Sequence, residues 1–214
     1  MKGFAWIFLL LIALPQWVNS HPHGWIDIRV NVVMNEAGQL AALEQRWKMD
    51  PFYSLALIEE LNLLGATGKS EALRLMADEI QQNLTAEQYN TEAEINDTRL
   101  AFGPVETYEL AEIEQQIVFM FTLPLSTPIS MQAATLQYQI FEPTYFLEML
   151  HEEDRNQPIP EALTVTGPLQ CETRIIAADP DPALVMEAAE LGIDEEGEHG
   201  LGRFFADTGE VVCQ

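Results

Sequence analysis

The sequence predicts an α+β fold: a strand-rich, mostly antiparallel, sandwich-like domain with a helical excursion around residues 51–88 and one late helix. Three observations support this prediction. Apolar and polar residues alternate in short stretches from residue 25 to the end of the chain, as in half-buried strands. Several of these stretches are joined by short connections, which is typical of antiparallel neighbours. A further stretch repeats apolar residues at three-residue spacing, as one face of a helix does.

The first predicted element is a β-hairpin over residues 25–49. Apolar residues alternate with polar ones from Trp25 to Met34 and again from Leu40 to Met49, with a turn at 35–38 between them. Asp50 and Pro51 stop the second strand. Aspartate is a preferred N-cap and proline a preferred first helical residue, so we expect a helix to begin here.

The helical excursion consists of two predicted helices. Apolar residues follow at three-residue spacing from Phe52 to Leu61, and the first helix ends at Gly65 and Gly68. The second helix runs from Ser70 to about Leu84.

The remaining chain is predicted to be mainly strands. A connector is expected at 123–128, a turn at 142–146 and an exposed loop at 154–160, because each is rich in proline or polar residues. Asp181 and Pro182 suit the start of a late helix that reaches about Leu191. The expected strands cover residues 91–95, 99–102, 105–112, 115–122, 134–141, 163–165, 172–177 and 211–213.

Residues 1–20 are predicted to be a signal peptide. Lys2 supplies a positive start, residues 4–14 are an unbroken apolar run, and Val18-Asn19-Ser20 is a pattern that signal peptidase accepts. Cleavage after Ser20 would leave residues 21–214 as a single exported, periplasmic domain. No cysteine lies near the cleavage site, so no direct lipid anchor is expected.

The charge of the chain limits its partners. The formal net charge is −24, which disfavours nucleic acid and anionic lipid because like charges repel. The acidic surface is expected to be simply solvated, with a weak cation-collecting surface or a docking site for a basic partner as the alternatives. The two cysteines, Cys171 and Cys213, are expected to form a disulfide in the oxidising periplasm.

The main candidate site is the His21-Pro22-His23 start of the mature chain. Cleavage after Ser20 would give His21 a free amine beside its imidazole, and His23 would add a third nitrogen. Pro22 has no amide N–H, which blocks coordination through deprotonated backbone amides. Imidazole suits zinc, nickel, cobalt and copper alike, so the metal stays open. The alternative is a frayed, solvent-exposed terminus.

Carboxylates and the other histidines are candidates for the missing ligands. Asp27 is the nearest, either as a ligand or as an acceptor for an imidazole N–H. Glu142, His151 and His199 are further candidates, although His151 is expected at the surface and His199 in a solvated loop. Asp50 is expected to be a helix cap rather than a ligand.

A set of motifs spread over the whole mature chain resembles a family of bacterial periplasmic proteins of unknown function. The family is labelled as the periplasmic component of an uncharacterised ABC-type transport system, and its members accompany nickel/cobalt-type transporters or genes of zinc homeostasis. The resemblance implies an accessory role with a membrane metal transporter as partner. Family members commonly carry aspartate at position 142, so the longer glutamate would reach a metal differently. The motifs are His21-Pro22-His23 with Trp25 and Asp27, Arg46 to Asp50 with Phe52, Ala101 to Pro104, Phe121 to Leu125, Glu142 to Phe146 and the two cysteines.

Three functional hypotheses follow. The first is a soluble periplasmic protein that binds a divalent transition metal (Zn, Ni/Co or Cu) and supports its transport or homeostasis. The second is a copper redox enzyme with a histidine brace at its terminus, which would need a further histidine from His151 or His199. The third is an acidic docking module for a membrane transporter that binds no metal. Hydrolase, P-loop and dinucleotide-binding motifs are absent from the sequence, so an enzyme is the less favoured class.

Overall fold

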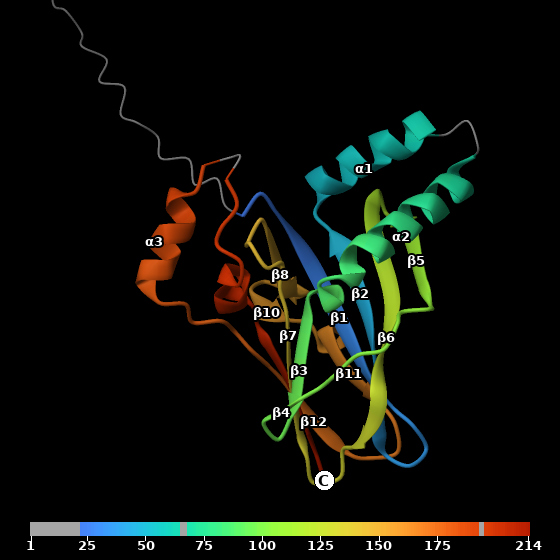
Figure 1. Cartoon of the computed structure of the whole chain (residues 1–214), viewed down its shortest axis with the longest axis vertical. Coiled ribbons are helices and arrows are strands. Elements are labelled where there is room, and N and C mark those ends of the chain that lie inside the picture. Colours follow the sequence, from blue (N-terminus) through green and yellow to red (C-terminus); the bar gives the residue numbers. More distant parts are fainter. Residues whose placement is uncertain (1–21, 65–67, 193–194) are drawn as a thin grey trace, which may run out of the picture.

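The computed structural model describes residues 22–64, 68–192 and 195–214. The predicted signal peptide and His21 lie outside this part of the chain. Figure 1 shows two sheets with α1 and α2 at one end and α3 at one side.

The helices are α1 (Pro51–Leu64), α2 (Lys69–Thr85) and α3 (Pro182–Glu190), with short 3-10 helices at Gln88–Asn90, Pro160–Ala162 and Leu201–Phe205. The strands are β1 (Gly24–Met34), β2 (Gln39–Met49), β3 (Thr91–Ile95), β4 (Thr98–Arg99), β5 (Tyr108–Ile113), β6 (Gln116–Ser130), β7 (Thr135–Ile140), β8 (Leu147–His151), β9 (Glu153–Asp154), β10 (Gln157–Pro158), β11 (Leu163–Thr166), β12 (Cys171–Ile176) and β13 (Thr208–Cys213).

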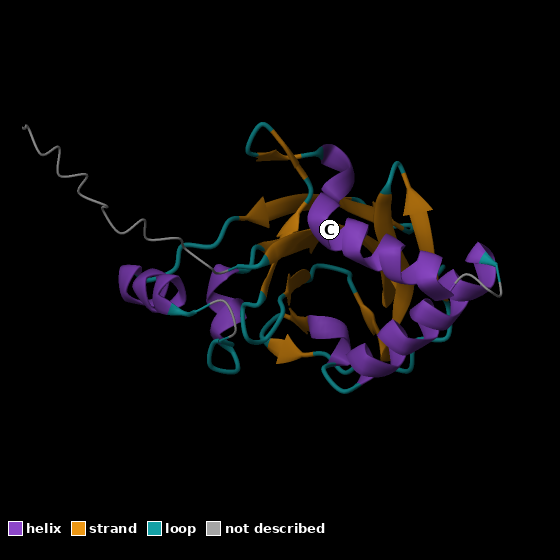
Figure 2. Ribbon diagram, turned by 90° about the horizontal axis from the view of Figure 1, so that it is seen from above, coloured by secondary structure: helices purple, strands orange, loops and turns teal. Residues whose placement is uncertain are grey.

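The two main sheets enclose one hydrophobic core. The first has the strand order β11-β1-β2-β6-β5, with β8 beside the first half of β1, and the second has the order β12-β13-β7-β3-β4. Both contribute their inward-facing residues to the same buried cluster. Figure 2 shows the sheets from above, with α1 and α2 across one end and α3 apart at one side. Most neighbours are antiparallel, while β8 and β11 run parallel to β1. The predicted strand-rich, sandwich-like α+β fold is confirmed.

The predicted hairpin at 25–49 is confirmed as β1 and β2. Its pairing brings Ile26 opposite Met49 and Val32 opposite Leu43. The even-numbered residues of β1 are buried and the odd-numbered ones lie toward solvent. This alternation gives β1 an inner face for the core and an outer face that carries polar groups.

Both helix starts follow the sequence signals. The Asp50 carboxylate accepts hydrogen bonds from the Phe52 and Tyr53 amides at 2.8 and 3.1 Å, and Asp181 accepts one from Ala183 at 2.8 Å. Because α1 is apolar on nearly all sides, it leaves apolar side chains in solvent, with Phe52 80 % exposed and Leu63 87 % exposed. In the part of the chain that the structure describes, no helix is long and apolar enough to cross a membrane.

The connector expected at 123–128 was wrong, and the exposed loop expected at 154–160 was partly right. The connector expected at 123–128 is the second half of β6, which continues to Ser130. Proline is tolerated in a strand at an edge or a bulge, and Pro124 lies where the pairing with β2 shifts register and where β5 no longer runs alongside. The loop expected at 154–160 contains the two-residue strands β9 and β10, which form a small exposed hairpin.

The predicted disulfide between Cys171 and Cys213 is confirmed. The two residues are directly opposed in the antiparallel pair of β12 and β13. The bond therefore fixes the last strand of the chain to the edge strand of the second sheet.

Candidate functional site

His23 is held in the folded domain by contacts with Phe146. Its backbone amide donates to the Phe146 carbonyl at 2.9 Å, immediately before β1 pairs with β8. The two rings also contact, with centroids 4.4 Å apart, and His23 is half-buried. The frayed terminus considered as the alternative does not apply to His23. His21 lies outside the described residues, so its placement remains a prediction.

A buried carboxylate lies beside the first residue of β1. A Cβ atom added to Gly24 would stand 2.5 Å from Asp50 Oδ2, so only glycine leaves room for this oxygen. The Asp50 amide donates to the Trp25 carbonyl at 3.0 Å, which continues the hairpin pairing to its open end. Asp50 is 3 % exposed. Its carboxylate thus lies between the start of α1 and Gly24.

The turn at 142–146 contacts His23 through Phe146. The Glu142 carboxylate accepts from the Thr144 amide and hydroxyl at 3.0 Å each and from the Phe146 amide at 2.6 Å. It thereby holds Phe146 in the position where the phenylalanine contacts His23. Glu142 lies at the same end of the molecule as His23, as a ligand would, but its oxygens already accept three hydrogen bonds within its own turn.

Asp27 lies on the outer face of β1. It forms an ion pair with Lys48 at 2.9 Å, and Lys48 also contacts Glu152 at 2.6 Å. Asp27 is four residues beyond His23, about 13 Å along an extended chain. The structure therefore does not bring Asp27 and His23 together.

His151 is buried in the core, contrary to its expected surface position. Its side chain is fully buried, with Nε2 2.8 Å from the Tyr138 hydroxyl and Nδ1 3.5 Å from Asp207 Oδ2. The expectation rested on the charged residues that follow His151. Pairing of β8 with β1 turns alternate residues inward, and His151 falls on the inner face, opposite Ile28. It lies about 13 Å along β8 from Leu147, the residue that pairs with Gly24.

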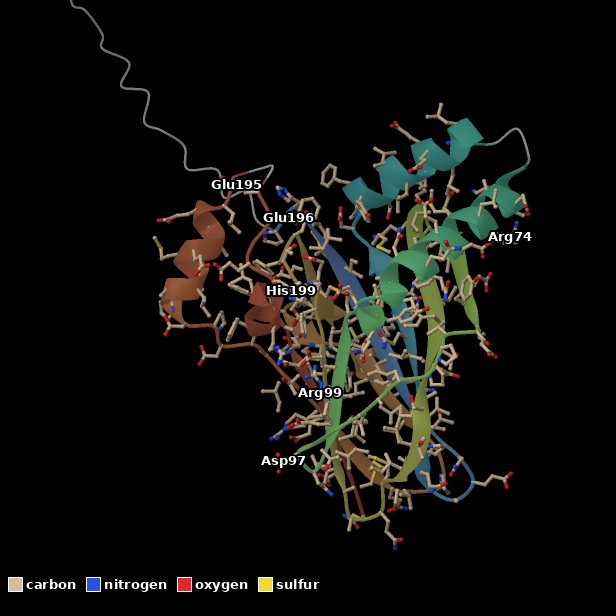
Figure 3. All side chains as sticks on the ribbon, in the orientation of Figure 1. Arg74, Asp97, Arg99, Glu195, Glu196 and His199 are labelled. Atoms are coloured by element: carbon tan, nitrogen blue, oxygen red, sulfur yellow. A yellow bond between two sulfur atoms is a disulfide. The ribbon has the colours of Figure 1, made fainter. Side chains whose placement is uncertain are left out.

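His199 lies in an exposed loop, as expected. Its side chain is 75 % exposed and stands 3.6 Å from Glu87. Figure 3 shows His199 with Glu195 and Glu196 on the loop that follows α3. This loop packs on the 142–146 turn through hydrogen bonds from the Gly197 amide to the Thr144 carbonyl and from the Gly200 amide to the Pro143 carbonyl.

Comparison with known proteins identifies the family. Residues 6–213 match the family described as a protein of unknown function, DUF1007. The chain belongs to this family. An uncharacterised protein of Haemophilus influenzae is 25 % identical to it over 218 residues, and the match covers all of both chains. No solved structure matches.

The described residues of this DUF1007 member include His23 but not His21. They contain no group of three or more His, Cys, Asp and Glu side chains placed to hold a metal. His23 and Asp50 both lie next to Gly24, and His21 is bonded to Pro22, the first described residue. The fit to a metal therefore depends on His21, which lies outside the described residues.

Sequence reasoning missed Asp50 as a neighbour of Gly24. The signal was present in the predicted hairpin, because pairing residues 25–34 with 40–49 brings the end of the second strand beside the start of the first. The expected helix-capping role of Asp50 uses only one of its two carboxylate oxygens.

Proposed function

We propose that this protein is exported to the periplasm and binds a divalent transition metal at its mature N-terminus, as an accessory to the transport or homeostasis of that metal. The observation that carries the proposal is the fixed position of His23. Its backbone hydrogen bond and its ring contact with Phe146 hold the half-buried imidazole at one place in the fold. A held imidazole loses less entropy on binding a metal than one on a mobile tail.

The donor set follows from the chemistry of the cleaved terminus. Cleavage after Ser20 gives His21 a free amine, whose proton a divalent metal can displace near pH 7, and an adjacent imidazole. His23 adds a second imidazole, and Pro22 keeps the backbone from contributing an amide nitrogen. These nitrogens suit zinc, nickel, cobalt or copper. The metal is cargo in this proposal and not a resident catalyst.

The copper redox enzyme has less support. A histidine brace needs a further histidine from elsewhere in the fold. His151 is enclosed between the two sheets on Tyr138 and Asp207, and His199 stands in solvent beside Glu87. Neither side chain is held near His23 in the described part of the chain.

An accessory protein needs a surface that docks its transporter, and the exposed apolar side chains of α1 are suited to this role. α1 begins directly after its cap, Asp50, and exposes Phe52, Leu55 and Leu63. Exposed apolar side chains grouped on one helix are typical of contact surfaces. We propose that this face contacts the membrane metal transporter that receives or delivers the metal. The same surface would serve a docking module without metal, and metal titration separates the two.

The test uses the exported protein, residues 21–214, stripped of metal. Isothermal titration with Zn²⁺, Ni²⁺, Co²⁺ and Cu²⁺ should give one tight site, with a Kd below about 1 μM for at least one metal. His23→Ala should weaken binding by at least about tenfold because one imidazole is lost. His199→Ala is the matched control, since it removes an exposed histidine, and should bind as the wild type does.

Two further results complete the test. Mass spectrometry of the exported protein should find His21 as the first residue, and a single serine placed before it should weaken binding because the amine moves away from the site. Wild-type protein that binds none of the four metals more tightly than about 10 μM would contradict the proposal.

A further inference from the structure

We propose that Arg99 and Arg203 form a binding site for a small oxyanion, a carboxylate or phosphate group, on the outer face of the second sheet. The site is separate from the proposed metal site and does not depend on it. Arg99 is the last residue of β4, and Arg203 lies in the 3-10 helix at Leu201–Phe205. More than a hundred residues separate the two arginines in the sequence, and the fold brings their side chains together.

Both guanidinium groups converge on one carboxylate oxygen. Nη2 of Arg99 and Nη2 of Arg203 each contact Oε1 of Glu92, which lies on the outer face of β3. Neither arginine pairs with a second acidic side chain among the described residues. Two positive charges therefore share one negative charge, and like charges this close repel each other. The contact keeps one uncompensated positive charge in a chain whose formal net charge is −24.

The two arginines retain hydrogen-bond donors for a ligand. Each guanidinium has five N–H donors in one plane, and Glu92 occupies a single nitrogen of each. The Arg203 group also lies over the ring of Phe141, 5.3 Å from its centroid, which limits its movement. The side chains of Arg99 and Arg203 are 68 % and 46 % exposed. Their remaining donors can therefore bind the paired oxygens of a carboxylate or phosphate.

The contact between Glu92 and the two arginines lines a groove in two parts. The larger part, of about 230 Å³, extends over Thr208 and the smaller, of about 170 Å³, extends to His199. Figure 3 shows Arg99 and His199 on the same side of the molecule. Volumes of this size fit a small molecule.

Acidic side chains at both ends of the groove restrict the ligand further. Glu94 lines the larger part, and Glu87 lines the smaller part, 3.6 Å from His199. An extended polyanion would meet these carboxylates and be repelled. A small anion bound at the arginines avoids them.

A strained turn borders the smaller part of the groove. Gln88, Tyr89 and Asn90 have φ angles of 49°, 56° and 52°, in the left-handed region that is unfavourable for residues other than glycine. Burial of Tyr89 against Phe121, with ring centroids 5.0 Å apart, holds the turn in this conformation. Gln88 and Asn90 line the groove, and their side-chain amides can donate to an anion. Strain of this kind is concentrated at functional sites, which supports the assignment.

The test is an NMR titration of the exported protein, ¹⁵N-labelled and free of metal, at low ionic strength. Inorganic phosphate and succinate are the two probes. At least one should bind with a Kd below about 5 mM and shift the amide signals of Glu92, Arg99 and Arg203. Tighter binding of phosphate would assign the ligand to phosphate compounds, and tighter binding of succinate would assign it to carboxylates.

Variants of single arginines locate the site. Arg99→Gln and Arg203→Gln should each weaken binding of the better probe by at least about fivefold, because each removes one guanidinium. Arg174→Gln is the matched control. Arg174 is an exposed arginine on the same sheet, but it forms a one-to-one ion pair with Glu210 at 2.6 Å. This variant should bind as wild type does.

A further variant keeps the inference testable should Arg203→Gln fold poorly after losing its contact with Phe141. Arg203→Lys retains the positive charge and the long aliphatic stem but replaces the planar group by an ammonium. It should remain folded by circular dichroism and weaken binding by at least about threefold, since a lysine cannot donate two parallel hydrogen bonds.

Three results would overturn the inference. The first is a Kd weaker than about 5 mM for both probes. The second is unchanged binding in Arg99→Gln and in both Arg203 variants. The third is an equal loss in Arg174→Gln, which would show attraction by general positive charge alone. Because the titration uses metal-free protein, its failure leaves the proposed metal binding untouched, and failure of metal binding leaves the anion site untouched.

Discussion

At the scale of single residues, Tyr138, His151 and Asp207 form a contact of polar side chains in the described core. All three are buried, and burial, reinforced by the charge of Asp207, raises the pKa of the Tyr138 hydroxyl well above its usual range. The hydroxyl therefore stays protonated and can donate to His151 Nε2. Gly209 makes the arrangement possible, because a Cβ there would lie 2.2 Å from Cζ of the tyrosine ring.

Tyr138→Phe should lower the free energy of unfolding by about 1–3 kcal/mol, because it leaves His151 Nε2 buried without a partner. Tyr108→Phe is the matched control. It also removes one hydroxyl hydrogen bond, to Asp78 at 2.9 Å, but from a partly exposed site, and should lose less than about 1 kcal/mol. Urea denaturation measures both. Equal losses in the free energy of unfolding would show that the buried hydrogen bond contributes no more than the partly exposed one.

At the scale of the elements, the outer face of β1 and β2 carries a network of opposite charges. Glu152, just after β8, contacts Arg29 and Lys48, and Arg46 lies 3.6 Å from it. Burial alone would raise the pKa of Glu152, but the hydrogen bonds from Arg29 and Lys48 outweigh it and lower the pKa to about 2. The network joins β8 to the hairpin through side chains as well as through backbone pairing.

Glu152→Gln should destabilise the protein by about 1–3 kcal/mol at pH 7, a range reduced for the solvent that reaches the network. The pKa of Glu152 is lower in the folded state, so its contribution is complete above the unfolded value near 4.5. It declines as the pH falls from there toward 2. Urea denaturation from pH 7 to pH 3 should therefore show the variant and wild type converging.

Glu153→Gln is the control for this comparison. Glu153 is exposed and forms no ion pair with the other described residues, so its variant should follow wild type at every pH. A Glu152→Gln curve that stayed parallel to wild type between pH 5 and 3 would contradict the assigned role of the carboxylate.

At the scale of the whole molecule, a strongly acidic chain folds into two sheets that share one hydrophobic core. The formal net charge of −24 opposes the compact state through self-repulsion. The disulfide between Cys171 and Cys213 acts against this by closing a loop with a sequence separation of 42. It holds β12 to β13, and β13 in turn pairs with β7 at the centre of the second sheet.

Replacing both cysteines by serine should lower the free energy of unfolding by about 2–4 kcal/mol, because the unfolded chain regains the freedom that the closed loop removes. Thermal unfolding with and without a reductant measures this. Wild type with reductant should unfold at the lower temperature of the double variant, and the double variant should not respond to reductant. A wild-type protein indifferent to reductant would show that the bond contributes little.

Local signals in the sequence determined much of the fold. Period-two alternation predicted the hairpin of β1 and β2, and Asp50-Pro51 predicted the start of α1, because both depend on residues close together in the chain. The same logic failed for the second half of β6. Pro124 indicates a break locally, and only the bulge opposite β2 and the end of β5 make a proline acceptable there.

The sequence by itself also selected His23 and Glu142, which the structure places at one end of the molecule, linked through Phe146. Only the tertiary structure decided the partners of the other candidates. β8 pairs with β1 across more than a hundred residues, and that pairing buries His151 on the inner face. Pairing of β1 with β2 ties Asp27 to Lys48 and sets Asp50 against Gly24. Composition and spacing name the groups able to bind a metal, whereas strand register determines which of them share a site.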